Sequence, residues 1–207
     1  MTHDNKTVTA YRLTLKDEIL DAAFAAFATQ GIKAVTMDDI AMKLSISKRT
    51  LYEIYATKEI LLFEGIKKYK IRTERIFLER IKQCDNVIDI IVDFYMAKAV
   101  EYKNTSPLFY SDLQKYPKLL GYLEQERKNG HERFKKFFKR GVEEGFFRPD
   151  VNDELLVAMF DGLGEYLQRK ELYRKYSFDE LFFNIFIVTL RGISTDKGVE
   201  ELDKRVF

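Results

Sequence analysis

The sequence contains little cysteine, histidine and proline, and no tryptophan. Its single cysteine, Cys84, excludes an intramolecular disulfide. The two histidines, His3 and His131, have no histidine, cysteine or carboxylate at the spacing of metal ligands on a helix, so we expect no metal site. No run of 18 or more apolar residues occurs, which argues against a membrane-spanning helix.

Sequence motifs of enzymes are missing as well. There is no Glu-x-x-His motif, no Ser-His-Asp arrangement with a suitable histidine, and no phosphate-binding loop. Gly162 and Gly164 lie within a predicted helix and follow no strand, so they do not form a nucleotide-binding loop. We therefore expect neither an enzymatic activity nor a bound cofactor.

A large charge of one sign is also lacking. The chain has 35 Lys and Arg against 33 Asp and Glu, so any nucleic-acid partner must be inferred from local features. The residues that follow Met1 are polar and do not form the apolar stretch of a signal peptide. We therefore expect a cytoplasmic protein.

The residues that are abundant predict an all-α fold. Apolar residues make up 46% of the chain, and they recur at helical spacing between only three prolines. We expect no strands and about nine helices, at residues 15–29, 36–44, 47–54, 58–81, 87–102, 106–115, 118–144, 153–173 and 178–193. The polar leader up to Arg12, including Lys6, is expected to be disordered rather than to form an arm that enters a minor groove. The residues from Ser194 onward are expected to fray.

Residues 36–54 are predicted to form a helix-turn-helix. Thr36 is a suitable N-cap, and Asp39 lies three residues later, which is a weaker form of the capping box. Ile40 and Leu51 then face inward, and Ser47 caps the second helix. Two short helices with a tight turn and a shared core form this motif.

The outward face of the second short helix carries hydroxyl and basic groups. Lys48 and Arg49 lie in its first turn, where a recognition helix meets base edges, and arginine can bond bidentately to guanine. The hydroxyls of this face can bond phosphate oxygens. Each residue also has a simpler interpretation: Thr36 and Ser47 as helix caps, Tyr52 and Tyr55 as half-buried packing, and Lys48, Arg49 and Lys58 as solvated charges. Their clustering on one short face favours DNA binding.

The stretch from Ile19 to Leu62 resembles the N-terminal domain of the TetR family. It has an Ala- and Phe-rich first helix, a Gly and a Thr before the second, Ser-Lys-x-Thr-Leu-Tyr at the start of the third, and Lys-Glu-x-Leu in the fourth. The resemblance implies a DNA-binding domain at 1–58, a ligand-binding and dimerisation domain at 59–207, and DNA contacts from Thr36, Ser47, Lys48, Arg49, Thr50, Tyr52, Tyr55 and Lys58.

Three positions differ from the family pattern. Ser45 occupies a turn position where glycine is usual, so we expect mild backbone strain there. Arg49 replaces a small residue, and Glu53 replaces an aromatic one. The base that Arg49 prefers is therefore the property that is least inferable from the family resemblance.

The last two long predicted helices are unusually apolar, which suggests a protein partner. The resemblance implies a homodimer built as a four-helix bundle, and two-fold symmetry then predicts a palindromic operator. The expected interface consists of Leu156, Met159, Phe160, Gly162, Leu163, Leu167, Leu181, Phe182, Ile185, Phe186 and Thr189.

Aromatic residues are concentrated in the middle of the chain. Some are expected to line a pocket for a small hydrophobic effector, although for any single one of them a place in the core is the favoured interpretation. The candidates are Phe94, Tyr95, Tyr102, Phe109, Tyr110, Phe134, Phe137, Phe138 and Phe160. The family resemblance then implies a repressor that the effector releases from DNA. The alternative is a helical adaptor or small-molecule-binding protein that does not use its helix-turn-helix.

Overall fold

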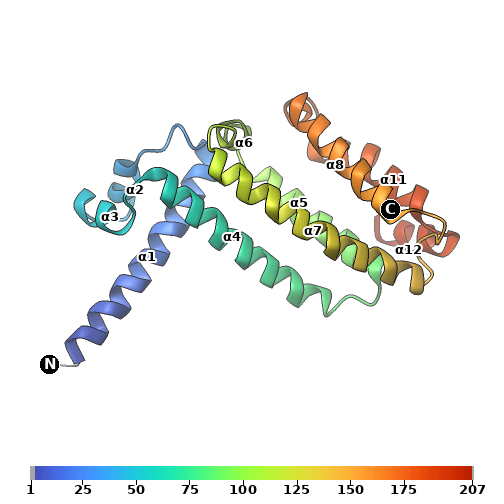
Figure 1. Cartoon of the computed structure of the whole chain (residues 1–207), viewed down its shortest axis with the longest axis horizontal. Coiled ribbons are helices and arrows are strands. Elements are labelled where there is room, and N and C mark those ends of the chain that lie inside the picture. The colour runs from blue at the N-terminus through green and yellow to red at the C-terminus, as the bar shows by residue number, and fades with distance from the viewer. Residues whose placement is uncertain (1–2, 207) are drawn as a thin grey trace. The chain divides into compact units, whose positions relative to one another are not determined.

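The computed structural model describes the backbone of residues 3–206 and the side chains of residues 11–167, 169–172 and 174–206. The predicted roles of His3 and Lys6 concern side chains outside this set. Within the described residues the structure has helices and no strand, and Phe147 and Ser194 form an isolated bridge. The predicted all-α fold is confirmed (Figure 1). None of the described helices is both long and apolar enough to cross a membrane.

The chain folds into two compact units. Unit 1 comprises Met1–Ile76 and Asn104–Leu120, and unit 2 comprises Phe77–Lys103 and Gly121–Phe207. The predicted functional division between residues 58 and 59 does not follow these units, because Leu61, Leu62 and Ile66 are buried in unit 1. That division stays a prediction about function.

Unit 1 is built on the first helix, α1 (His3–Gln30), whose buried stripe contains Ile19, Ala23 and Phe27. α1 begins well before the predicted start at residue 15, so residues 3–12 of the leader are helical and the expectation of disorder is wrong for them. The unit also contains α2 (Met37–Lys43), α3 (Lys48–Ile54), most of α4 (Lys58–Ile81), α6 (Pro107–Leu113) and the start of α7 (Pro117–Glu143).

α6 fixes the turn between α1 and α2. The Ser106 N–H donates to the Ala28 carbonyl at 2.7 Å. The Lys33 N–H donates to Oδ2 of Asp112 at 2.7 Å, and Asp112 is buried. Gly31 has a φ of +90°, a backbone conformation that glycine adopts without steric cost. A segment distant in sequence therefore holds the start of the helix-turn-helix.

Unit 2 contains α5 (Val87–Lys103), most of α7, α8 (Asp153–Arg169), α9 (Leu172–Lys175), α10 (Phe178–Leu181), the π-helix η1 (Phe182–Ile187), α11 (Val188–Ile193) and α12 (Asp196–Val206). Its core is apolar and rich in aromatic residues. The buried members are Val87, Ile88, Phe138, Phe146, Phe147, Leu156, Phe186, Ile187, Leu190 and Leu202.

Two predictions about the C-terminal helices are wrong, and one is confirmed in its bounds. The helix predicted at 153–173 ends at Arg169, because Glu171 has a φ of 48° and interrupts it. The helix predicted at 178–193 has these bounds and consists of α10, η1 and α11, of which η1 is π-helical. Residues 196–206 do not fray: they form α12, in which Leu202 is fully buried and Arg205 forms an ion pair with Asp89 at 2.8 Å.

Candidate nucleic-acid interface

α2 begins with the predicted capping box. The Asp39 N–H donates to Oγ1 of Thr36 at 3.2 Å, and the Thr36 N–H donates to Oδ2 of Asp39 at 2.8 Å. Hydrogen bonds from the Thr36 hydroxyl and backbone lower the pKa of Asp39. Ile40 and Ala41 are buried, so this face of α2 joins the core of unit 1.

The turn after α2 contains the strained residue that the sequence predicted. Ser45 has a φ of 54°, in the left-handed region that residues with a Cβ adopt at a cost of roughly 1–2 kcal/mol. The next residue, Ile46, donates its N–H to the Ala41 carbonyl at 3.0 Å. The strained turn thus fixes the direction in which α3 leaves α2.

α3 is capped by Ser47 and anchored by one buried residue. Oγ of Ser47 accepts from the Thr50 N–H at 3.0 Å, and Leu51 is fully buried. This anchoring leaves Lys48 and Arg49 exposed, with side-chain exposures of 67% and 89%. The short helix therefore presents its first turn to solvent.

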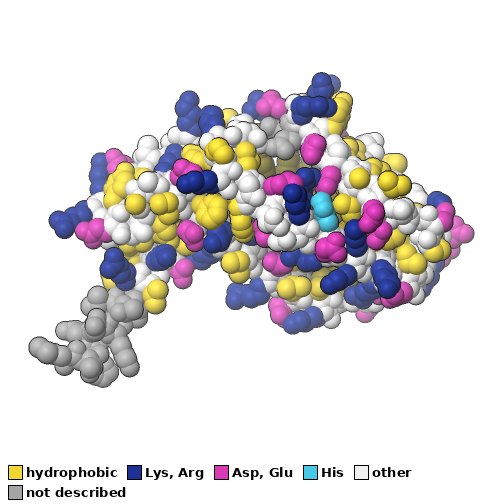
Figure 2. Space-filling view, viewed as in Figure 1, with side chains coloured by type: hydrophobic (Ala, Val, Ile, Leu, Met, Phe, Trp, Pro, Cys, Tyr) yellow, Lys and Arg dark blue, Asp and Glu magenta, His cyan; other side chains and the backbone are white. Residues whose placement is uncertain are grey.

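Both basic side chains of α3 are paired with carboxylates of the same chain. Lys48 bonds Asp38 of α2, and this hydrogen bond raises the pKa of Lys48. Nε of Arg49 donates to Oε1 of Glu53 at 2.8 Å. Figure 2 shows basic and acidic side chains interspersed over the face that it draws. The two positive charges of α3 therefore each have a negative partner within the helix-turn-helix.

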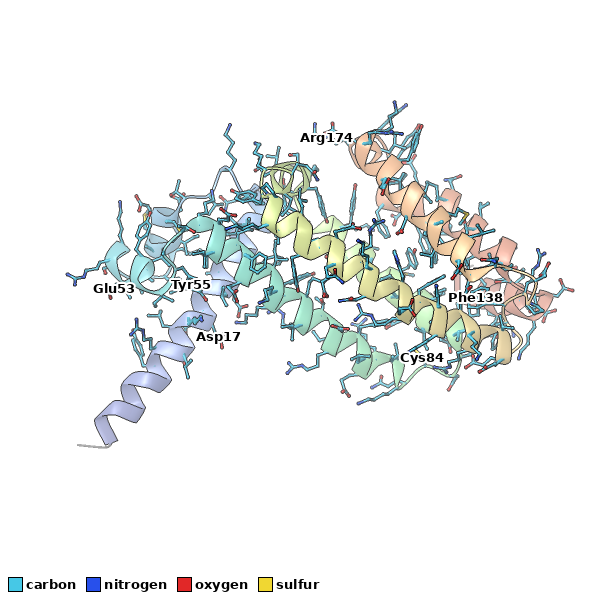
Figure 3. The ribbon with its side chains drawn as sticks, viewed as in Figure 1. Asp17, Glu53, Tyr55, Cys84, Phe138 and Arg174 are labelled. Carbon is cyan, nitrogen blue, oxygen red and sulfur yellow. The ribbon has the colours of Figure 1, made fainter. Side chains whose placement is uncertain are left out.

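Tyr52 and Tyr55 occupy different environments. Tyr52 is 47% exposed on α3, as expected for a phosphate contact. Tyr55 is only 2% exposed, and burial raises the pKa of its hydroxyl. Figure 3 shows Glu53 at the outer edge of α3 and Tyr55 closer to α1. The prediction that Tyr55 contacts DNA is wrong, and its packing interpretation holds.

Replacing Tyr55 with phenylalanine is expected to leave the free energy of unfolding unchanged or to raise it by about 1 kcal/mol, because the buried hydroxyl has no hydrogen-bond partner among the described residues. Urea denaturation measures the change. DNA affinity should be unaffected. A loss of more than about 1 kcal/mol would show that the hydroxyl stabilises the fold.

α4 begins with a capped end and a half-buried lysine. Oγ1 of Thr57 accepts from the Ile60 N–H at 3.2 Å. Nζ of Lys58 lies 5.6 Å from the centre of the Phe27 ring. Burial lowers the pKa of Lys58, and the nearby carboxylates of Asp112 and Asp39 oppose that effect. Lys58 is thus less exposed than the basic residues of α3.

The predicted pocket residues fall into both units. In unit 1, Phe109 is buried and lies edge-on to Phe24, with ring centres 6.0 Å apart, and Tyr110 lies edge-on to Phe109 at 5.7 Å. In unit 2, Phe138 is buried and stacks on Phe147 at 5.3 Å. Phe109 and Phe138 therefore pack as core residues in this structure, and a role in ligand binding for these two stays a prediction.

The other pocket candidates of unit 2 are half-buried or exposed. Tyr95 stacks on Phe186 with ring centres 3.4 Å apart, and burial raises the pKa of its hydroxyl. Phe94 is 37% exposed, and Tyr102 lies 5.4 Å from Phe178 between ring centres. Phe134, Phe137 and Phe160 pack against the core. A role in ligand binding for these residues stays a prediction.

The predicted dimer residues are divided between the core and the surface. Leu156 and Phe186 are buried in the core of unit 2, and Phe160 and Phe182 pack against that core, so placing Leu156 and Phe186 at an interface is wrong. Met159 is 44% exposed, and nothing lies near the position of a Cβ at Gly162. Leu163, Leu167, Leu181, Ile185 and Thr189 are half-buried.

The predicted dimer residues do not include the most exposed apolar residues of α8. Leu155 is 70% exposed and Tyr166 is 47% exposed. With Met159 and Gly162 they recur at helical spacing along one side of α8, which we call the α8 stripe. Phe183 and Val188 are likewise exposed, at 42% and 62%. The spacing within α8 was the signal that could have identified this face.

Comparisons with known proteins agree with this geometry. Residues 19–64 match the family model described as bacterial regulatory proteins, tetR family. The HTH-type transcriptional repressor KstR2 of Mycobacterium tuberculosis (strain ATCC 25618 / H37Rv) is 27% identical over 147 residues, which are 68% of this chain and 73% of the relative.

Solved structures show the same fold. The ketosteroid transcriptional regulator KstR2 of Mycobacterium tuberculosis has a TM-score of 0.58 and 22% identity, covering 87% of this chain and 95% of that chain. A putative transcriptional regulator from Saccharomonospora viridis in complex with choline has a TM-score of 0.72 and 16% identity, covering 88% and 98%. Together, these findings show that residues 19–64, which include α2 and α3, are similar to the tetR family of bacterial regulatory proteins, and that the chain shares its fold with the two solved regulators.

Proposed function

We propose that this chain is a DNA-binding transcriptional repressor that reads the major groove with α3. The observation that carries the proposal is the exposed first turn of α3, where Lys48 and Arg49 extend into solvent while Leu51 anchors the helix. An anchored helix with exposed basic residues meets the requirements of a recognition helix. The likeness to KstR2, itself named a transcriptional repressor, supports the direction of regulation.

The residues of the site divide by the part of DNA that they contact. Arg49 reads a base edge, because two guanidinium donors match the O6 and N7 acceptors of guanine. Lys48 reads an adjacent base, and Tyr52 and Thr50 donate to phosphate oxygens. Thr36, Ser47 and Lys58 position the helix ends at the backbone, since helix N-termini favour phosphate.

The active form is a homodimer that pairs through the α8 stripe and the exposed residues Phe183 and Val188. Exposing this apolar face to water is unfavourable, and the same face of a second copy of the chain covers it. Two-fold symmetry places two copies of α3 on one duplex, and the operator is then palindromic.

A small hydrophobic effector that binds unit 2 releases the repressor from DNA. The half-buried aromatic residues Tyr95, Tyr102 and Phe178 are the candidates for contact with such an effector, because ligand sites of this kind are mostly apolar with a few polar groups. The effector shifts the dimer to a state that no longer fits the operator, which requires that it bind that state more tightly. One structural relative is named a ketosteroid transcriptional regulator and the other was solved in complex with choline, which supports a small organic molecule as the ligand here.

Mobility-shift measurements on the DNA upstream of the gene for this chain test the proposal. The wild type should bind that DNA, Arg49→Ala should relax base preference at one position, and Lys58→Ala should weaken binding to all sequences alike. Lys139→Ala, which removes an exposed lysine of unit 2, serves as the control and should leave binding unchanged. Equal binding by all four proteins would favour the adaptor that leaves its helix-turn-helix unused.

A further inference from the structure

The recognition face of α3 contains a carboxylate that the proposed function does not use. Glu53 lies one helical turn after Arg49, and its side chain is 54% exposed. An exposed acid on a surface that binds DNA repels phosphates, so it lowers affinity for every sequence. If Glu53 contributes to recognition, it does so by changing base preference and not by raising affinity.

The geometry of the pair supplies that effect. Oε1 of Glu53 accepts from Nε of Arg49 at 2.8 Å, and no bond to the two terminal guanidinium nitrogens is formed by Glu53. Guanine is recognised bidentately by donors of the arginine side chain. Because the guanidinium group is planar, holding Nε fixes the plane of the group and the direction in which the two terminal nitrogens point their end-on pair of N–H donors.

The same carboxylate also discriminates against other DNA contacts. A free arginine can bond any phosphate, and such contacts carry no sequence information. Glu53 competes with phosphates for the guanidinium group and repels the backbone. Contact with guanine through the terminal nitrogens leaves the Arg49–Glu53 bond intact and brings no second negative charge near the carboxylate, whereas a phosphate on the same nitrogens is repelled by Glu53. The pair therefore penalises nonspecific binding more than specific binding.

We propose that Glu53 is a positioning residue for base recognition, which holds Arg49 so that its terminal donors face a guanine and which weakens nonspecific contacts. This inference rests on the proposed DNA-binding function. It concerns two positions at which this chain differs from the pattern usual in the tetR family, so it deepens the proposed function with a feature of this chain's own residues.

The experiment selects bound sequences from a pool of random double-stranded DNA with the full-length protein. Wild type should enrich a sequence with a guanine at one position, and Glu53→Gln should lower the preference for that guanine about tenfold while raising affinity for the unselected pool. Glu18→Gln removes the same charge from an exposed residue of α1 and should leave the preference unchanged. Circular dichroism checks that all variants are equally helical.

A double-mutant cycle shows whether Glu53 acts through Arg49. In an Arg49→Ala background, Glu53→Gln should no longer change the preference at the selected position. An unchanged preference in the single Glu53→Gln variant, or an equal loss in both backgrounds, would overturn the inference. If wild type enriches no sequence at all, the proposed DNA-binding function fails instead.

Discussion

Replacing Met159 with glutamate is expected to convert the proposed dimer into monomers and to lower affinity for operator DNA more than about 100-fold. Met159 is 44% exposed in the centre of the α8 stripe, between Leu155 and Gly162. An unpaired carboxylate in an apolar interface costs several kcal/mol, and two-fold symmetry applies that cost twice. A monomer holds only one half-site, so it loses the gain in affinity that comes from linking two binding events.

Analytical ultracentrifugation measures the dissociation, and fluorescence anisotropy with the selected DNA measures the loss of affinity. Ile71→Glu is the matched control, because Ile71 is 65% exposed on α4 and lies outside the α8 stripe. It adds the same charge at an exposed apolar position and should leave the dimer intact. A Met159→Glu variant that remains dimeric would refute the α8 stripe as the dimer interface.

Replacing Asp112 with alanine is expected to lower the free energy of unfolding by about 2–3 kcal/mol, as for other buried hydrogen bonds to charged groups. Asp112 is buried, and its carboxylate accepts from the Lys33 N–H at 2.7 Å and from Nζ of Lys115 at 3.2 Å. Alanine leaves the Lys33 N–H without this acceptor. Urea denaturation measures the loss, and Asp150→Ala, which breaks an exposed pair with Arg148, should cost less than about 1 kcal/mol.

The stabilisation by Asp112 is also expected to depend on pH. Burial opposes ionisation of Asp112, but hydrogen bonds from Lys33 and Lys115 outweigh it and lower the pKa below 3.8. The unfolded state therefore takes up a proton at higher pH than the folded state does. The stability difference between wild type and Asp112→Asn should be largest above pH 4 or so and should shrink as the pH falls through the folded pKa. A constant difference down to about pH 2 would contradict an ionised Asp112.

Local sequence signals predicted the helix-turn-helix well. Thr36 and Ser47 cap helices through hydrogen bonds to residues three positions away, so their roles follow from short-range spacing. Ser45 was predicted to be strained because it occupies a turn position where glycine is usual, and its φ is positive. Tyr55 was misplaced because α3 ends at Ile54 and Tyr55 is extended, so extrapolating the helical period beyond the helix gave the wrong face.

Features that depend on distant residues were not predictable in this way. α8 has two apolar faces offset by one residue, one containing Leu156 and the other Leu155, and spacing alone does not say which one packs on the chain's own core. The contact between Asp112 and Lys33 joins residues 79 positions apart. Local sequence patterns predict neither this contact nor the π-helical segment in the C-terminal helices.

Unit 1 is assembled from two separate stretches of the sequence, and this has a practical consequence for protein engineering. An N-terminal fragment that stops at residue 58 or 76 lacks α6. It therefore also lacks the carboxylate of Asp112, which accepts the hydrogen bond from the Lys33 N–H. Such a fragment would leave the Gly31 turn without the backbone bond from Ser106 to Ala28. A chimeric regulator that takes its DNA-binding helices from a homologue therefore has to include residues 104–120 of that homologue together with its N-terminal helices.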